Sequence, residues 1–140
     1  MTRPKMILAG GNGFLGQHLT RYFTQLGYSV VVLSRQPQAR GVQWDGRTLG
    51  PWAAELEGAA VVINLAGRTV DCRYTAANKD AITRSRTEST RVIGQAIGAC
   101  QNPPAVWLNL STATIYTHTE GKEPANTEAA GLLVTTSPKR

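Results

Sequence analysis

The chain has 140 residues, a formal net charge of +6 and an ordinary globular composition, with 41% hydrophobic and 17% charged residues. This length allows one domain with its own core, and no apolar run approaches the roughly 20 residues that a membrane-spanning helix needs. Two cysteines indicate neither a disulfide framework nor a metal site. Because the N-terminus shows no signal-peptide pattern, we expect a cytoplasmic protein with no membrane partner and no metal.

The basic residues are spread along the whole chain instead of forming a stripe. Their densest group, Arg84, Arg86 and Arg91, has no aromatic neighbours. Nucleic-acid-binding proteins usually gather positive charge on one face or along one helix, so we expect no nucleic-acid partner. An anionic cofactor or substrate accounts for the sign of the charge equally well.

The first predicted element is a buried strand at residues 6–9, which leads into Gly10, Gly13 and Gly16, three residues apart. Residues 14–26 then carry apolar side chains at steps of three and four, which predicts a helix. A strand, a glycine turn and a helix in this order are typical of a dinucleotide site. The first glycine turns the chain, the second lets backbone approach a pyrophosphate, and the third lets the helix pack on the strand. A purely structural turn is the alternative.

The start of this helix predicts an anion-binding surface. The first N–H groups of a helix have no partner inside it, and the helix dipole stands behind them. We therefore expect the cofactor to contact Gly10, Gly13, Phe14, Leu15 and Gly16.

The rest of the chain alternates between apolar strands and helices. The expected strands are residues 28–33, 42–44, 59–67 and 105–110, and the expected helices are residues 52–56 and 76–99. This alternation predicts an α/β fold, a Rossmann-like doubly wound parallel sheet with strand order 3-2-1-4-5 and a ligand at the carboxyl ends of its strands. We expect a dinucleotide-binding domain at residues 1–116. Residues 117–140 are then an irregular tail or a truncated substrate region.

The end of the second strand indicates which cofactor is bound. A carboxylate there binds the ribose hydroxyls of NAD, whereas an arginine accommodates the 2′-phosphate of NADP. This chain has Ser34 and Arg35 at that place, and the planar guanidinium of Arg35 suits a phosphate. We expect NADP in preference to NAD, with Arg40 adding charge. The alternative is an ordinary exposed arginine.

Four further segments carry a family resemblance. They are Trp-Asp-Gly at residues 44–46, Val-Ile-Asn-Leu-Ala-Gly at 62–67, Ser-Arg-Thr-Glu-Ser-Thr at 85–90 and Ser-Thr-Ala-Thr-Ile-Tyr at 111–116. Together with the glycine turn they resemble the extended and atypical short-chain dehydrogenase/reductase proteins. The closest resemblance is to the NAD(P)-dependent epimerase/dehydratase-like "epimerase family" proteins. It covers residues 6–116, which correspond to the N-terminal part of a longer family protein.

The resemblance implies roles for individual residues. Those that it implies for cofactor binding are Asn64, Leu65, Ala66, Gly67, Arg86 and Ser111. Thr112 would hold the reacting oxygen of the substrate, and Tyr116 is the first candidate for the acid/base. The alternatives are a simple chain turn at residues 66–67, a solvated helix arginine, and a hydroxyl-rich strand end without chemistry.

The Tyr-x-x-x-Lys pair of these enzymes is missing from this chain. In that pair the lysine lowers the tyrosine pKa, so that phenolate chemistry is accessible near neutral pH. Two functions therefore stay open. One is an NADP-dependent oxidoreductase or epimerase that exchanges hydride at a carbinol or carbonyl carbon of a small-molecule substrate. The other is a non-catalytic dinucleotide-binding or redox-sensing regulatory protein.

The fifth predicted strand ends the sheet and has an open edge. Such an edge exposes unpaired backbone groups and apolar surface. We expect the tail to cover it or a second chain to pair with it, which would make the protein a homo-oligomer.

Overall fold

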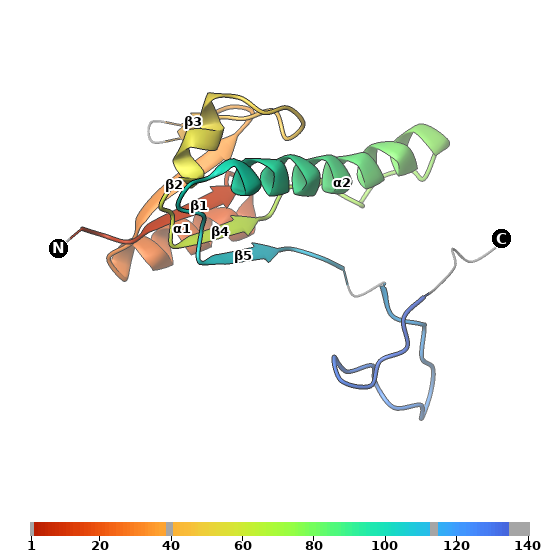
Figure 1. Cartoon of the computed structure of the whole chain (residues 1–140). Helices are drawn as coiled ribbons and strands as arrows, with labels where there is room; N and C mark the ends of the chain where they lie inside the picture. Colours follow the sequence, from red (N-terminus) through yellow and green to blue (C-terminus); the bar gives the residue numbers. More distant parts are fainter. Residues whose placement is uncertain (1, 39–40, 113–114, 135–140) are drawn as a thin grey trace. The chain divides into compact units, whose positions relative to one another are not determined.

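The computed structural model describes residues 2–38, 41–112 and 115–134. The chain divides into two compact units, Met1–Leu110 and Ser111–Arg140. The first unit contains every helix and strand of Figure 1. In chain order they are β1 (Lys5–Ala9), α1 (Phe14–Gln25), β2 (Ser29–Ser34), β3 (Gly41–Gln43), the 3₁₀ helix η1 (Pro51–Leu56), β4 (Val61–Asn64), α2 (Ala76–Ala99) and β5 (Val106–Asn109).

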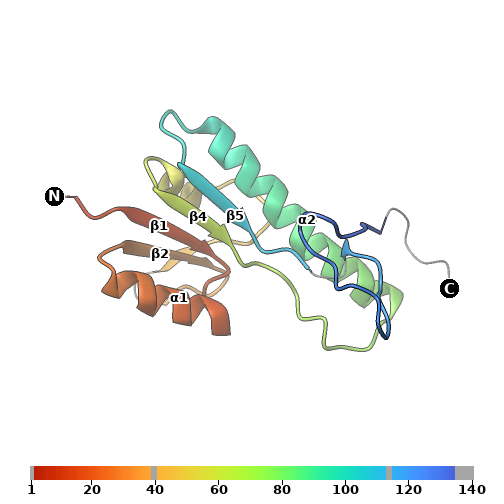
Figure 2. The ribbon, with the colours of Figure 1, turned by 90° about the horizontal axis from the view of Figure 1, so that it is seen from below.

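The five strands form one parallel sheet in the order β3-β2-β1-β4-β5, which confirms the predicted topology. Helix α1 lies on one face of this sheet, whereas η1 and α2 lie on the other (Figures 1 and 2). A parallel sheet needs cover on both faces because its strands are apolar on both sides. The arrangement is therefore the doubly wound α/β fold that the alternating elements predicted.

The core lies between the sheet and the layer formed by η1 and α2. Its buried members are Ile7, Ala9, Leu33, Trp44, Trp52, Leu56, Ala59, Val62, Val92, Ile93 and Ala96. The second half of α2 supplies the last three of these residues, as its apolar spacing predicted. The first half of α2 is polar and extends beyond the sheet (Figure 1).

The fourth strand is shorter than the predicted residues 59–67: β4 begins at Val61 and ends at Asn64. The side-chain Oδ1 of Asn64 accepts a hydrogen bond from the backbone N–H of Ala66 at 3.0 Å. This short-range bond competes with strand pairing and turns the chain away from the sheet. The apolar run continues beyond the strand to Ala66, which packs against the glycine turn. A Cβ on Gly10 would lie 2.9 Å from the Cα of Ala66.

Strand β5 forms one edge of the sheet. Among the described residues it pairs with β4 alone, and all four of its own residues are exposed. In the second unit, Tyr116 and Leu133 form an isolated antiparallel bridge. Nowhere in the described part of the chain is a helix both long and apolar enough to cross a membrane.

Candidate cofactor site

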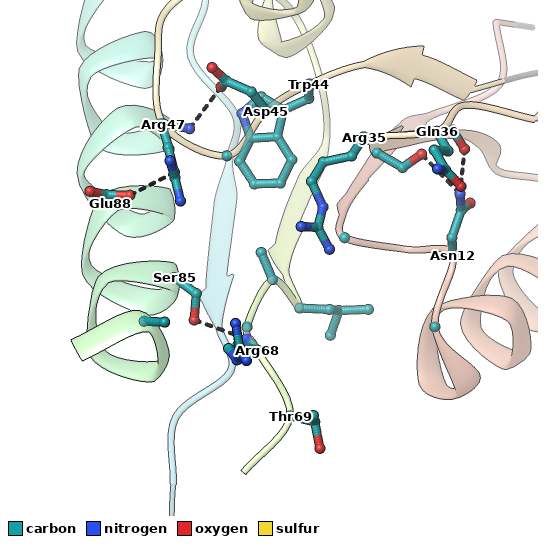
Figure 3. A pocket seen from close by; sticks show the side chains of 18 residues that line it. Asn12, Arg35, Gln36, Trp44, Asp45, Arg47, Arg68, Thr69, Ser85 and Glu88 are labelled. Carbon is teal, nitrogen blue, oxygen red and sulfur yellow. Dashed lines mark hydrogen bonds and ion pairs between the residues drawn. The ribbon is translucent and has the colours of Figure 1, made fainter. Parts of the chain in front are cut away.

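A pocket of about 930 Å³ lies in the first unit at the carboxyl ends of the strands (Figure 3). Its volume is within the usual range of small-molecule and cofactor sites. The walls come from the glycine turn, the ends of β2 and β3, the loop after β4 and the first half of α2. Of the residues expected from the sequence, those that line it are Gly10, Gly13, Ser34, Arg35, Leu65, Ala66 and Gly67.

The three glycines of the turn have different surroundings. Gly10 has a φ of +77°, which other residues rarely adopt, and it contacts the backbone of Ala66. A Cβ on Gly16 would overlap the backbone of Gly11. A Cβ on Gly13, in contrast, would have no atom within 4 Å. The first and third glycines are therefore needed by the protein itself, whereas Gly13 borders free space that a ligand can enter.

Helix α1 starts at this free space. Its N-cap residue, Gly13, provides no side-chain hydrogen bond, and the first helical bond runs from Gln17 N to the Gly13 carbonyl at 3.0 Å. The N–H groups of Phe14, Leu15 and Gly16 thus have no acceptor within α1. Unpaired N–H groups at the positive end of a helix dipole favour a bound anion.

At the end of β2, the glycine turn and the strand are joined by Asn12. Its Nδ2 donates to Ser34 Oγ at 2.9 Å and to the Gln36 carbonyl at 2.8 Å. Arg35, between these two acceptors, is exposed and extends into the pocket (Figure 3). Within the described residues its guanidinium makes no hydrogen bond or ion pair. Arg40, which we expected to add charge, lies outside the described residues.

Two carboxylates line the pocket, and each has hydrogen-bond or ion-pair partners within the protein. Asp45 accepts hydrogen bonds from Arg47 N at 2.8 Å, Thr48 N at 3.0 Å and Thr48 Oγ1 at 2.7 Å. These bonds, led by the one from the Thr48 N–H, lower the pKa of Asp45. Glu88 Oε2 lies 3.1 Å from Arg47 Nε, and Arg91 Nη2 donates to the Arg47 carbonyl at 2.8 Å. The loop after β3 is thereby tied to α2.

The side chain of Asn64 is 3% exposed and is held inside the protein. Besides accepting from Ala66 N, it donates from Nδ2 to Asn109 Oδ1 at 2.7 Å and to Ser89 Oγ at 3.2 Å. Asn64 therefore fixes the loop that presents Leu65, Ala66 and Gly67 to the pocket. A direct contact between Asn64 and the cofactor stays a prediction.

Arg86 lies behind the same loop. Its Nη1 donates to the carbonyls of Arg68 and Ile82, each at 3.2 Å, and a Cβ on Gly67 would lie 3.1 Å from its Cζ. Arg86 borders a separate hollow on α2 with Thr87, Thr90 and Arg91. The contacts that the structure gives Arg86 support the loop, and its contact with cofactor also stays a prediction.

Several pocket residues were not singled out from the sequence. Asn12 occupies a variable position of the glycine pattern, and Arg68 directly follows the Asn-Leu-Ala-Gly segment. The Trp-Asp-Gly segment entered the resemblance without an assigned role, yet Trp44 and Asp45 both line the pocket. Trp44 is 3% exposed, and its ring meets that of Trp52 edge to face at a centroid distance of 5.7 Å.

The two residues expected to act on the substrate, Thr112 and Tyr116, and the expected cofactor residue Ser111 belong to the second unit. Ser111 and Thr112 are exposed, and Tyr116 is half-buried. Ala113 and Thr114, in the same segment, lie outside the described residues. The roles assigned to Ser111, Thr112 and Tyr116 stay predictions.

A parallel sheet of this order, with a glycine turn leading into a helix and a pocket at the strand ends, defines a Rossmann-type nucleotide-binding domain. Residues 6–138 match the model of the NAD dependent epimerase/dehydratase family, and the chain belongs to this family. This confirms the resemblance found in the sequence.

Two curated relatives illustrate the similarity. The epimerase family protein YfhF of Bacillus subtilis is 36% identical over 115 residues, which cover 78% of this chain and 38% of YfhF. The human epimerase family protein SDR39U1 is 27% identical over 115 residues, which cover 80% of this chain and 38% of that protein. The chain thus spans less than half the length of these relatives.

Solved structures share the fold. The human SDR39U1 structure with NADPH has a TM-score of 0.72 and 27% sequence identity, covering 82% of this chain and 39% of that one. MoeE5 in complex with UDP-glucuronic acid and NAD has a TM-score of 0.70 and 22% identity, covering 84% of this chain and 40% of that one. At that identity the likeness to MoeE5 concerns the fold alone.

Proposed function

We propose that this chain binds NADP(H) in the pocket at the ends of β1, β2 and β4, and that it prefers NADP(H) to NAD(H). The observation that carries this proposal is the contrast between Arg35 and the two pocket carboxylates. The guanidinium of Arg35 has no hydrogen-bond or ion-pair partner among the described residues, whereas the carboxylate of Asp45 accepts hydrogen bonds from Arg47 and Thr48 and that of Glu88 pairs with Arg47. A free carboxylate at this place would repel a 2′-phosphate, and a free guanidinium binds one.

The relatives support a nucleotide cofactor. The human SDR39U1 structure is described with NADPH, and MoeE5, which is similar in fold, is described with NAD. The fold alone is thus compatible with either cofactor. The preference for NADP(H) in this chain is argued from Arg35 and the engaged carboxylates.

In the whole protein, the cofactor would supply or accept a hydride at a carbinol or carbonyl carbon of a small-molecule substrate. The N–H groups at the start of α1 would bind its pyrophosphate, and Arg35 would bind its 2′-phosphate. The backbone of residues 65–67 would lie along the adenine and its ribose. Thr112 would hold the substrate oxygen, and Tyr116 is the first candidate for the acid/base. We place this activity in the cytoplasm as part of the same proposal.

A second candidate is a non-catalytic protein whose cofactor-bound state controls a partner. The observation that favours it is the missing Tyr-x-x-x-Lys pair within these 140 residues. Steady-state oxidation of NADPH by the full-length protein, with a panel of aldehydes and ketones, separates the two candidates. We expect this chain to bind the cofactor and to show little turnover.

Calorimetric titration of the chain with NADPH and NADH tests the binding proposal. We expect NADPH to bind more tightly by roughly tenfold or more, since one charge-assisted hydrogen bond is worth about 1.5–3 kcal/mol. Equal affinities would refute the preference for NADP(H), and no binding of either cofactor would overturn the assignment of the pocket.

A further inference from the structure

We propose that Arg68 is a second anion-binding residue of this pocket and that it contacts the cofactor pyrophosphate together with the start of α1. The inference rests on the proposed function, because it concerns how the same pocket holds the same cofactor. Arg68 would then set the affinity for the cofactor without choosing between NADP and NAD.

The position of Arg68 supports this role. It belongs to the loop after β4, and this loop packs on the glycine turn, where Gly10 and Ala66 are in close contact. Arg68 and the glycine turn line the same pocket, with Arg35 extending into it from the end of β2 (Figure 3). Besides Arg47, which pairs with Glu88, two arginines thus line one pocket from two different parts of the chain.

Neighbouring groups fix Arg68 at several points. Its backbone N–H donates to Ser85 Oγ at 2.9 Å, and its carbonyl accepts from Arg86 Nη1 at 3.2 Å. Its Nη2 donates to Asn78 Oδ1 at 3.0 Å. Asn78 is itself held, because its Nδ2 donates to the Arg73 carbonyl at 2.7 Å. A side chain that is already oriented loses less conformational freedom when a ligand binds.

The charge of Arg68 differs from that of its neighbours in how it is paired. Arg47 and Arg84 pair with the carboxylates of Glu88 and Asp80, each at 3.1 Å. Arg68 has no such partner in the described ranges, and Asn78, which orients it, is neutral. One bond to Asn78 leaves most of the five N–H donors of a guanidinium unused. A cation held in place by a neutral acceptor, with donors to spare, is suited to bind a phosphate group.

The two arginines would therefore have different tasks. Arg35 follows β2, where the 2′-phosphate of NADP is bound in this fold. Arg68 lies on the loop that contacts the glycine turn, which holds the pyrophosphate. The pyrophosphate is common to NAD and NADP, so a loss of Arg68 would weaken both cofactors by the same factor.

The test compares Arg68→Gln with the control Arg73→Gln, an exposed arginine of the same loop that does not line the pocket. Calorimetry measures the affinities for NADPH, ADP-ribose and adenosine 2′-phosphate. The weaker ligands are measured in competition mode. ADP-ribose contains the pyrophosphate without a 2′-phosphate, and adenosine 2′-phosphate the reverse. We expect Arg68→Gln to bind NADPH and ADP-ribose roughly ten- to hundredfold more weakly than the wild type. Its affinity for adenosine 2′-phosphate would change by less than about threefold, and the control would behave as wild type.

A lysine at the same position keeps the charge, so Arg68→Lys should recover part of the lost NADPH affinity, whereas a folding defect would not depend on charge. Wild-type affinity in Arg68→Gln would overturn the role of Arg68 and leave the proposed function intact. A loss of affinity confined to ligands with a 2′-phosphate would also overturn this role, because Arg68 would then bind the 2′-phosphate and not the pyrophosphate. If the wild-type chain binds no NADPH, the proposed function itself fails.

Discussion

Gly16, in the first turn of α1, lies directly against the backbone of Gly11, and a Cβ atom on Gly16 would overlap it. A similar approach joins Gly10 to Ala66, where a Cβ would lie 2.9 Å from the Ala66 Cα. These two contacts bring α1 and the loop after β4 onto the glycine turn. Gly13, between them, has no such neighbour. The glycine pattern thus contains two residues that shape the pocket and one that leaves room for a ligand.

The contact between Gly16 and Gly11 predicts that Gly16→Ala destabilises the fold. Overpacking of this kind costs about 1–3 kcal/mol, and the melting temperature of a chain of this size falls by roughly 4 °C per kcal/mol. Thermal unfolding followed by circular dichroism measures the change. Gly98→Ala is the control, because a Cβ there would have no atom within 4 Å. An unchanged melting temperature in Gly16→Ala would show that α1 can shift away from the turn.

Gly13→Val should abolish NADPH binding and leave the fold intact. The φ of Gly13 is −74°, which valine adopts readily, and the space around a Cβ is open. In the bound state the new side chain would occupy the place of the pyrophosphate. Calorimetry with NADPH measures binding, and the melting temperature checks the fold. A folded Gly13→Val protein with wild-type affinity would contradict the assignment of the glycine turn.

Arg35→Asp should weaken NADPH far more than NADH. The change replaces a phosphate partner by a like charge and removes a contact worth about 1.5–3 kcal/mol, which is one to two decades in affinity. Parallel titrations with both cofactors measure the ratio. Arg3→Asp makes the same change of charge outside the pocket and should alter the ratio little. Equal losses for NADPH and NADH would mean that Arg35 does not bind the 2′-phosphate.

The contribution of Asp45 to the stability of the protein should decrease in acid. Its hydrogen bonds hold the pKa of the Asp45 carboxyl below the ordinary value of 3.8. A lowered pKa in the folded state contributes stability above the unfolded value, and this contribution is lost as the pH falls through the folded value. The stability difference between wild type and Asp45→Asn should therefore be constant near neutral pH and shrink below pH 3.8. Urea unfolding across this range measures it. A constant difference down to low pH would contradict the role of the charge.

The exposed edge of the sheet predicts self-association. Strand β5 carries no charged residue, and Val106, Trp107 and Leu108 are all more than a third exposed. We propose that two copies pair along this edge, so a lysine within it should favour the monomer. Light scattering over a concentration series should show a smaller mass for Leu108→Lys than for wild type. Leu26→Lys, at the exposed C-cap of α1, is the control. A wild-type monomer at every concentration would refute this pairing.

The elements that follow from local pattern were predicted well. Helix α2 has the predicted bounds because Thr75 caps it, with its hydroxyl accepting from Asn78 N at 3.2 Å, and because two prolines follow its end. The end of β4 was predicted wrongly, since the side chain of Asn64 decides it. Hydrophobic periodicity contains no information about such a bond.

Of the residues that line the pocket, the sequence indicated those that belong to backbone motifs and missed those that depend on side chains from distant segments. The glycine turn and the end of β2 could be found because the dinucleotide pattern fixes their spacing. The link between Arg47 and Glu88 could not, because it joins a loop to a helix far along the chain. Arg68 was missed because a single arginine after a strand carries no pattern of its own.

The position of Trp44 would make the fluorescence of the protein sensitive to a cofactor bound in the pocket. The indole lines the pocket, is shielded from solvent and lies beside a second tryptophan. Reduced nicotinamide cofactors absorb light at the wavelengths that tryptophan emits, so a bound molecule would quench Trp44 by energy transfer. The emission of the unlabelled protein would then report how much of the pocket is filled.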